Sequence, residues 1–371
     1  MKKEDYMTRN KGVDIFRTIA LLLVLIYHAW TVCGTPTIDS SIVRLLVSFG
    51  GEIGVTAFFC LSGFGIYHSL ASMERKGQLT FKNHMKKRWL RVAPQYYLNL
   101  MVLVLFGGSV IYLSKDGIWN ILSHLFFAHN ISIEYHGSMN GVLWTMAIIF
   151  QFYLLAIALY KMMKKQPYLF WIASVIFTVG MKFVALRWAG VMYGGVTSWV
   201  FYVGRQLPTA LDNFTIGMLV AYLVSKDKML TKQKWIGPLL VFIGTIAMLF
   251  VCQYGKISGV HRVGISGYIW HSLLAITIGI ILYGFSQIQL GENHIVTKIL
   301  LWISDVEYGV YLWHLVMFHN LISGSAWIAN LLMGGHVVGA IVILVILAIL
   351  VGAVFTKLTD TWMEKTLRDK K

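Results

Sequence analysis

Apolar stretches long enough to cross a lipid bilayer follow one another along almost the whole chain of 371 residues. A membrane-spanning helix needs about 20 predominantly apolar residues. The sequence therefore predicts an all-α integral membrane protein, built as a bundle of about ten transmembrane helices. The expected spans are residues 14–33, 47–71, 95–113, 143–163, 168–186, 207–225, 236–253, 268–287, 299–322 and 336–356.

The composition argues against the two main alternatives to a membrane protein. Charged residues make up 13% of the chain and hydrophobic residues 57%. Soluble domains average about 25% charged and about 45–50% apolar residues, so a soluble globular enzyme is not expected. A disordered chain is not expected either, because disorder needs low hydrophobicity.

The net charge of +16 is explained by orientation in the membrane rather than by binding to nucleic acid. With the N-terminus inside, 25 of the 32 Lys and Arg residues fall on inner segments and 7 on outer segments. Cytoplasmic segments carry the excess of Lys and Arg, so both termini are expected inside and no nucleic-acid partner is expected. Residues 1–371 are expected to form a single transmembrane domain with no separate soluble domain.

Two segments are expected to be irregular. Three glycines and Glu52 interrupt the start of span 47–71, which predicts a broken or re-entrant helix shielded by protein. Segment 117–131 is apolar but too short to cross the bilayer, and it is expected to be interfacial or re-entrant.

Ionisable side chains inside a span are costly and usually functional, and the first span carries three of them. Arg17 and His28 are eleven residues apart, within about 20° of three helical turns, and Asp14 lies one turn before Arg17. All three therefore project from one face, with a rise of about 16 Å from Arg17 to His28. Alternatively, Asp14 and Arg17 are interface anchors and His28 is a hydrogen-bonded interior residue.

A basic cluster before the third span contains Arg88 and Arg91, which lie one turn apart on the same face. Guanidinium groups bind phosphate oxygens in pairs, so a phosphate-binding role competes with a simple membrane anchor. Trp144 is either a site residue or a member of the aromatic belt. His271 is expected to be a satisfied interior histidine. The other polar residues noted inside spans are Gln151, Asp212 and His314.

Six segments in a fixed order carry a resemblance to a known family. GVDIFRTIALLLVLIYH at 12–28 contains an arginine, ten further residues and a histidine, and FFCLSGF lies at 58–64. The others are RWLRVAPQYY at 88–97, LWTMAIIFQFY at 143–153, LDNFTIGM at 211–218 and YGVYLWH at 308–314. In these segments the chain resembles the membrane acyltransferase 3 family, which acylates bacterial surface glycans.

The resemblance implies an O-acyltransferase, most simply an O-acetyltransferase, of the bacterial plasma (inner) membrane. The implied donor is cytoplasmic acyl-CoA, with acetyl-CoA expected and no metal. The implied acceptor is a hydroxyl of a surface or secreted glycan, or of its lipid-linked precursor. Arg88 and Arg91, with help from Arg17, are expected to bind the phosphates of CoA.

The resemblance also implies catalytic roles. His28 is expected to act either as a general base or as an acyl carrier, and the sequence does not separate these roles. Asp14 is expected to pair with Arg17 and orient it. The candidate substrate-binding residues are Ser62, Trp144, Gln151, Tyr153, Asp212 and His314.

Two positions depart from the family pattern. The glutamate usual in the fourth-span segment falls on Ile149, and Glu307 stands where a serine is common. If the missing glutamate acts in relatives, another residue must serve in this chain.

Two rival classes are considered. A transporter or flippase of lipid-linked saccharides would also have many spans, but it would consume no thioester. Transporters often show two related halves, and no such symmetry is visible here. A membrane sensor is the third class, and no soluble signalling domain is present to support it.

Overall fold

The computed structural model describes residues 9–106, 115–193, 202–226, 234–258, 264–290, 294–324 and 335–368, and every regular element among them is helical. Residues 107–113 of the expected span 95–113 lie outside the described residues. The helices are α1 (Lys11–Val32), α2 (Ser41–Ser48), α3 (Gly50–Arg75), α4 (Phe81–Phe106), α6 (Lys115–Leu125), α7 (Trp144–Lys165), α8 (Pro167–Tyr193), α10 (Leu211–Lys226), α11 (Ile236–Ser258), α12 (Ile265–Gln287), α13 (Ile295–Gly324) and α15 (Val337–Arg368), with short 3-10 turns η1 (His129–Ile131) and η2 (Leu207–Thr209).

Seven helices in the described part of the chain are long and apolar enough to cross a bilayer. They are α1, α3, α7, α8, α11, α12 and α15, and each coincides with a span expected from the sequence. The other three expected spans correspond to α4, α10 and α13, which are not in this set, and α10 has only 16 residues. The structure therefore confirms an all-α membrane protein and supports seven of its spans directly.

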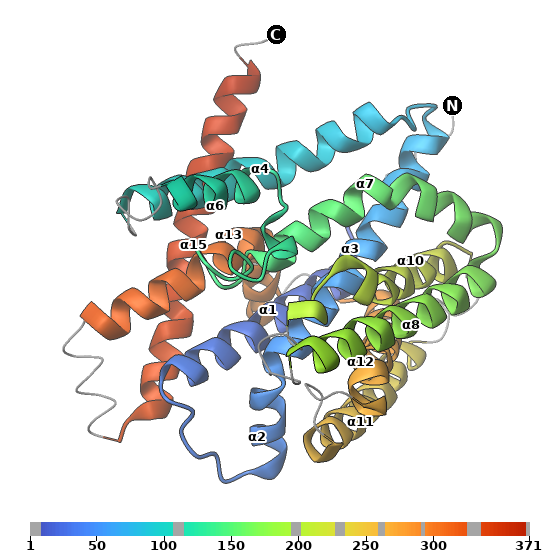
Figure 1. The fold of residues 1–371 in the computed structure, drawn as a ribbon. Coiled ribbons are helices and arrows are strands. Elements are labelled where there is room, and N and C mark those ends of the chain that lie inside the picture. The colour runs from blue at the N-terminus through green and yellow to red at the C-terminus, as the bar shows by residue number, and fades with distance from the viewer. Residues whose placement is uncertain are drawn as a thin grey trace.

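α1 and α3 lie near the middle of the bundle in Figure 1, with α8, α10, α11 and α12 on one side and α4, α13 and α15 on the other. In the most apolar part of α3, 72% of the residues are buried inside the protein, against 22% for α8, α11 and α15. Phe242 and Phe250 of α11 are 65% and 72% exposed. In a membrane protein, such side chains face lipid rather than water. Functional side chains are therefore sought around the central pair of helices.

The interruption expected in span 47–71 lies at Phe49, between α2 and α3, and the glycines after it are helical. A Cβ on Gly54 would lie 2.6 Å from the carbonyl oxygen of Ala20 on α1. Glycine lacks that atom, so the backbones of α3 and α1 approach closely. The glycines that suggested a broken helix are packing positions in a continuous one.

α3 and α10 also cross at glycines. A Cβ on Gly217 of α10 would clash with the carbonyl oxygen of Cys60, and a Cβ on Gly63 of α3 would clash with that of Phe214. Close helix crossings at small residues are typical of membrane bundles. This crossing joins the two helices on which much of the site depends.

Gly217→Ala is expected to destabilise the folded protein by about 1–3 kcal/mol, because the added methyl group overlaps backbone that cannot move aside. Gly65→Ala is the matched control, since a Cβ at Gly65 meets nothing within 4 Å. Thermal unfolding in the same detergent compares the two variants. Equal melting temperatures for both variants would contradict the tight crossing.

The C-terminal end of α6 is hydrogen-bonded to α4. The hydroxyls of Tyr96 and Tyr97 on α4 donate to the carbonyl oxygens of His124 (3.0 Å) and Leu125 (2.8 Å) at the end of α6. Figure 1 shows α6 alongside α4. The short helix expected at 117–131 is therefore held against protein, where irregular backbone is tolerated at membrane depth.

Candidate functional site

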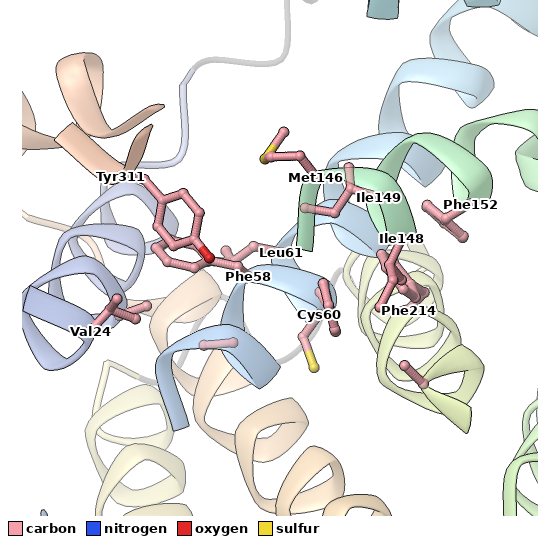
Figure 2. Close-up of a cluster of buried hydrophobic side chains, with 14 of the residues drawn as sticks. Val24, Phe58, Cys60, Leu61, Met146, Ile148, Ile149, Phe152, Phe214 and Tyr311 are labelled. Atoms are coloured by element: carbon pink, nitrogen blue, oxygen red, sulfur yellow. The ribbon is translucent and has the colours of Figure 1, made fainter. Parts of the chain in front are cut away.

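A cavity of about 120 Å³ lies between α1, α3, α4, α7 and α13. We call it the arginine cavity, after the three arginines in its wall. Figure 2 shows part of its apolar wall, with Phe58, Leu61 and Tyr311 facing Met146 and Ile149. Its lining residues are Arg17, Val55, Phe58, Phe59, Leu61, Ser62, Gly65, Ile66, Arg88, Arg91, Val92, Thr145, Met146, Ile149, Tyr153, Glu307, Tyr308 and Tyr311.

Arg88 is the most unusual group in the cavity wall. It is 5% exposed, its Nε has no hydrogen-bond partner, and no carboxylate of the described residues forms an ion pair with it. Its guanidinium lies 5.7 Å from the centroid of the Tyr153 ring. Burying a charge without a counter-ion is costly, so the wall around Arg88 is suited to receive an anion.

Arg17 lines the same cavity but is already paired. Its Nη1 donates to Oδ1 of Asp14 at 2.8 Å, and its Nε lies 3.1 Å from Oε2 of Glu307. Asp14 also pairs with Arg9, which reaches Asp305 on α13 at 2.6 Å. The pairing of Asp14 with Arg17 is as predicted. Glu307 is a second partner, which the sequence did not indicate.

His28 forms a pair with His314, whose ring is fully buried. Nδ1 of His314 lies 2.7 Å from the carbonyl oxygen of Tyr311, and its Nε2 lies 3.1 Å from Nδ1 of His28. A carbonyl oxygen only accepts, so Nδ1–H of His314 must be the donor. With both rings neutral, Nε2 of His314 then accepts from Nδ1–H of His28. This leaves Nε2 of His28 with a lone pair, as a base or nucleophile requires.

Tyr311 lies between the histidine pair and the arginine cavity. Its carbonyl oxygen orients His314, while its ring lines the cavity and its hydroxyl lies 2.9 Å from that of Thr145. His28 itself does not line the cavity. Arg17 and His28, which share one face of α1, therefore differ in their relation to the cavity. Arg17 lies in its wall, whereas His28 lies one layer of residues behind it.

A smaller pocket of about 20 Å³ lies beside Trp144. We call it the Trp144 pocket. It shares Val55 and Phe59 with the arginine cavity, so these side chains lie between the two spaces. The remaining lining residues are Glu52, Thr56, Trp144, Lys182, Gly204, Arg205, Thr209, Ala210, Asn213 and His271.

The predicted substrate-binding residues are distributed over several places. Ser62 and Tyr153 line the arginine cavity, and Trp144 lines the smaller pocket. Gln151 lines neither, because its amide donates to Asn130 Oδ1 (2.8 Å) and to the Phe127 carbonyl (3.2 Å) and so holds the segment after α6.

Asp212 and His314 lie outside both walls. Asp212 is 1% exposed and lies behind the Trp144 pocket, next to the lining residue Asn213. His314 contacts His28 instead of a lining position. Asp212 and His314 therefore contact residues of the candidate site without lining either space.

Three charged residues in the wall of the Trp144 pocket were not predicted as site residues, namely Glu52, Lys182 and Arg205. Lys182 is 2% exposed in α8. Arg205 pairs with Glu52 at 2.7 Å, and His271 lies 3.4 Å from the same carboxylate. The sequence did contain a signal for two of them. Lys182 lies inside the expected span 168–186 and Glu52 inside 47–71, and ionisable residues inside a span are usually functional.

A family of acyltransferases and several acetyltransferases are similar to this chain. The family described as an acyltransferase domain matches residues 10–357. A peptidoglycan O-acetyltransferase of Listeria monocytogenes is 26% identical over 85% of this chain and 50% of its own length. A putative acetyltransferase of Acidianus two-tailed virus is 21% identical over 85% of this chain and 87% of its own length.

An O-acetyl transferase of Shigella phage Sf6 is 26% identical over 40% of this chain and 45% of its own length. The chain thus spans about half the length of the Listeria relative. No solved structure matches the chain.

Proposed function

Because the chain belongs to the acyltransferase family that matches residues 10–357, we propose that it is a multi-pass membrane O-acyltransferase. It moves an acyl group, most simply acetyl, from acyl-CoA to a hydroxyl of a surface or secreted carbohydrate or its lipid-linked precursor. Its place is the bacterial plasma membrane. The observation that carries the proposal is the arginine cavity, which holds a buried guanidinium with no counter-ion among the described residues and is joined through Tyr311 to the His28–His314 pair.

The donor's phosphates bind at the end of the cavity formed by Arg88 and Arg91, since both line it and neither forms an ion pair with a described residue. Guanidinium groups suit phosphate because they donate two parallel hydrogen bonds to it. Arg17 contributes less than expected, because Asp14 and Glu307 already hold it. The acyl thioester then extends along the apolar wall toward Tyr311.

In the chemical step, Nε2 of His28 takes the proton of the acceptor hydroxyl while that oxygen bonds to the thioester carbonyl carbon. The carbon–sulfur bond breaks, and the leaving thiolate takes the proton back from His28. His314 is a positioning residue, because it accepts from Nδ1–H of His28 and so keeps Nε2 free of its proton. The rival role, in which His28 carries the acyl group itself, uses the same nitrogen.

The proposed membrane arrangement has ten spans with both termini inside, α4, α10 and α13 joining the seven apolar helices. Two contacts support it. Arg17 lies level with Glu307, and His28 lies level with His314. α1 and α13 therefore run in the same direction, as the first and ninth spans of an alternating bundle do.

The test uses the purified full chain in lipid nanodiscs with acetyl-CoA and a thiol-reactive dye. Release of free CoA thiol that increases when a carbohydrate acceptor is added supports the proposal. If no thiol is released with or without acceptor, while a lipid-linked saccharide crosses the bilayer of proteoliposomes, the chain is a transporter instead.

Glu307→Gln is expected to tighten binding of CoA by about threefold to tenfold at low salt, because it frees Arg17 in the cavity wall and one charge–charge contact contributes about 1 kcal/mol. Asp305→Asn is the matched control, since Asp305 lies on the same helix but its side chain is 56% exposed. Calorimetric titration with CoA at two ionic strengths measures the effect. Equal affinities for the two variants would show that Glu307 does not compete with the donor.

A further inference from the structure

The Trp144 pocket collects charged groups that the acyl-transfer step does not use. Lys182 of α8 and Asp212 of α10 are 2% and 1% exposed. Arg205 and Glu52 form an ion pair at 2.7 Å with side chains 19% and 16% exposed. Buried ion pairs contribute little to stability and are costly inside a membrane bundle, so this set is better explained by a ligand than by folding.

The charges in and behind the pocket balance. Lys182 and Arg205 supply two positive charges, and Glu52 and Asp212 supply two negative charges. His271, which lies 3.4 Å from the Glu52 carboxylate, adds no charge in its neutral form. A charged ligand would leave one sign in excess in a medium that solvates charge poorly. The pocket is therefore suited to a neutral ligand.

Unused hydrogen-bonding groups indicate what kind of neutral ligand fits. Asn213 lines the pocket, is 4% exposed, and its Oδ1 has no hydrogen-bond partner within 3.5 Å among the described residues. Both carboxylate oxygens of the adjacent Asp212 also lack one within that distance. These oxygens can accept from a donor, and the ammonium group of Lys182 can donate to an acceptor. A hydroxyl group does both.

The ring of Trp144 is held in place at the pocket wall. The guanidinium of Arg205 lies 4.4 Å from its centroid, and the ring of His136 is nearly parallel to it at 5.7 Å. Burial, followed by the charge of Arg205, lowers the pKa of His136 to about 4. His136 is therefore neutral near pH 7 and leaves the charge balance of the pocket unchanged.

The pocket lies close to the reacting histidine. Trp144 of the pocket wall is followed by Thr145, whose hydroxyl lies 2.9 Å from that of Tyr311, and the carbonyl oxygen of Tyr311 lies 2.7 Å from Nδ1 of His314. Val55 and Phe59 separate the pocket from the arginine cavity, where the donor is proposed to bind. A group held in the pocket would thus lie beside the donor cavity, close to the residues that hold the histidine pair.

We propose that the Trp144 pocket is a subsite for one hydroxyl or hydroxymethyl group of a neutral saccharide acceptor. This rests on the proposed function, and it adds where the acceptor binds and that the bound part carries no charge. The volume of about 20 Å³ agrees with this size, because a space of about 10–15 Å³ holds one water molecule. Asn213 and Asp212 accept from the bound hydroxyl, and Lys182 donates to it.

The test measures binding of chitotriose, a neutral trisaccharide, and of trigalacturonate, a charged one, to the full chain in nanodiscs by calorimetry. Asn213→Leu, which keeps the side-chain size, is expected to weaken chitotriose binding about fivefold or more, the loss expected for one hydrogen bond with an unpaired partner left behind. The affinity for CoA is expected to stay the same. Asn83→Leu, on the exposed start of α4, is the control.

A second variant covers the case in which Asn213→Leu does not fold. Lys182→Met combined with Asp212→Asn removes both buried charges together, so no charge is left without a partner, and it is expected to weaken chitotriose binding by a similar factor. Unchanged chitotriose binding in the folded variants, no chitotriose binding by the wild type, or tighter binding of trigalacturonate than of chitotriose would each overturn the proposal. Failure of the proposed function is separate, because it appears as absence of thiol release from acetyl-CoA in the wild type.

Discussion

His28→Asn is expected to lower the rate of acyl transfer by about 10²–10⁴-fold, the contribution typical of a positioned general base. The asparagine amide can still donate to Nε2 of His314, as Nδ1–H of His28 does. The variant therefore keeps the contact between α1 and α13 and removes only the nitrogen that handles the acceptor's proton. The affinity for CoA should stay within about twofold of the wild type, because His28 does not line the arginine cavity.

The matched control for this variant is His68→Asn. His68 lies on α3 and lines neither pocket, so its loss should leave the rate near the wild-type value. The measurement is the release of CoA thiol at saturating acetyl-CoA and acceptor. If His28→Asn retains the wild-type rate, neither the base nor the acyl-carrier role is correct.

Arg88→Gln is expected to raise the KM for acyl-CoA about 10–100-fold, with a smaller effect on kcat. A hydrogen bond to a charged group contributes about 1.5–3 kcal/mol, and each 1.4 kcal/mol is a factor of about ten in affinity. Arg88 is 5% exposed and lines the cavity, so a phosphate held there is shielded from water and salt. Arg88→Lys should restore part of the loss, since it returns the charge but not the paired donors.

Lys87→Gln is the control for the Arg88 variant, because Lys87 is the adjacent cation but does not line the cavity. The measurement is the KM for acetyl-CoA, together with direct titration with CoA. If the KM rises equally in both variants, the basic cluster acts only through its overall positive charge. Arg88 and Arg91 would then be membrane anchors rather than phosphate-binding residues.

Seven of the expected spans and the shared face of Arg17 and His28 on the first helix were predictable from local pattern. Apolar length predicted seven spans that the structure supports directly. The eleven-residue spacing of Arg17 and His28 placed them on one face of α1, and both contact α13 from that face. These features depend on residues close in sequence, where helical periodicity is informative.

Long-range partners were not predictable in the same way. His314 lies 286 positions from His28, and a lone histidine in the ninth span gave no indication of which group it bonds. The three glycines near residue 50 suggested a broken helix, because the sequence shows the flexibility of glycine but not the neighbouring backbone that Gly54 contacts. Gln151 was expected to face a substrate, yet it bonds the segment after α6.

The departure at Ile149 is informative once the cavity is known. Ile149 lines the arginine cavity, and among the lining residues of that cavity Glu307 supplies the carboxylate. The acid is thus on α13 rather than on α7, and it is paired with Arg17. We expect it to adjust the charge that the donor meets, which is the effect that Glu307→Gln measures.

The central claim is that this membrane domain transfers an acyl group from CoA to a carbohydrate. The most direct measurement uses the purified chain in proteoliposomes with acetyl-CoA radiolabelled in the acetyl group and a neutral oligosaccharide acceptor. The account predicts label in the oligosaccharide, one free CoA for each acetyl group transferred, and loss of both in His28→Asn. Label that stays on CoA while the saccharide crosses the bilayer would contradict it.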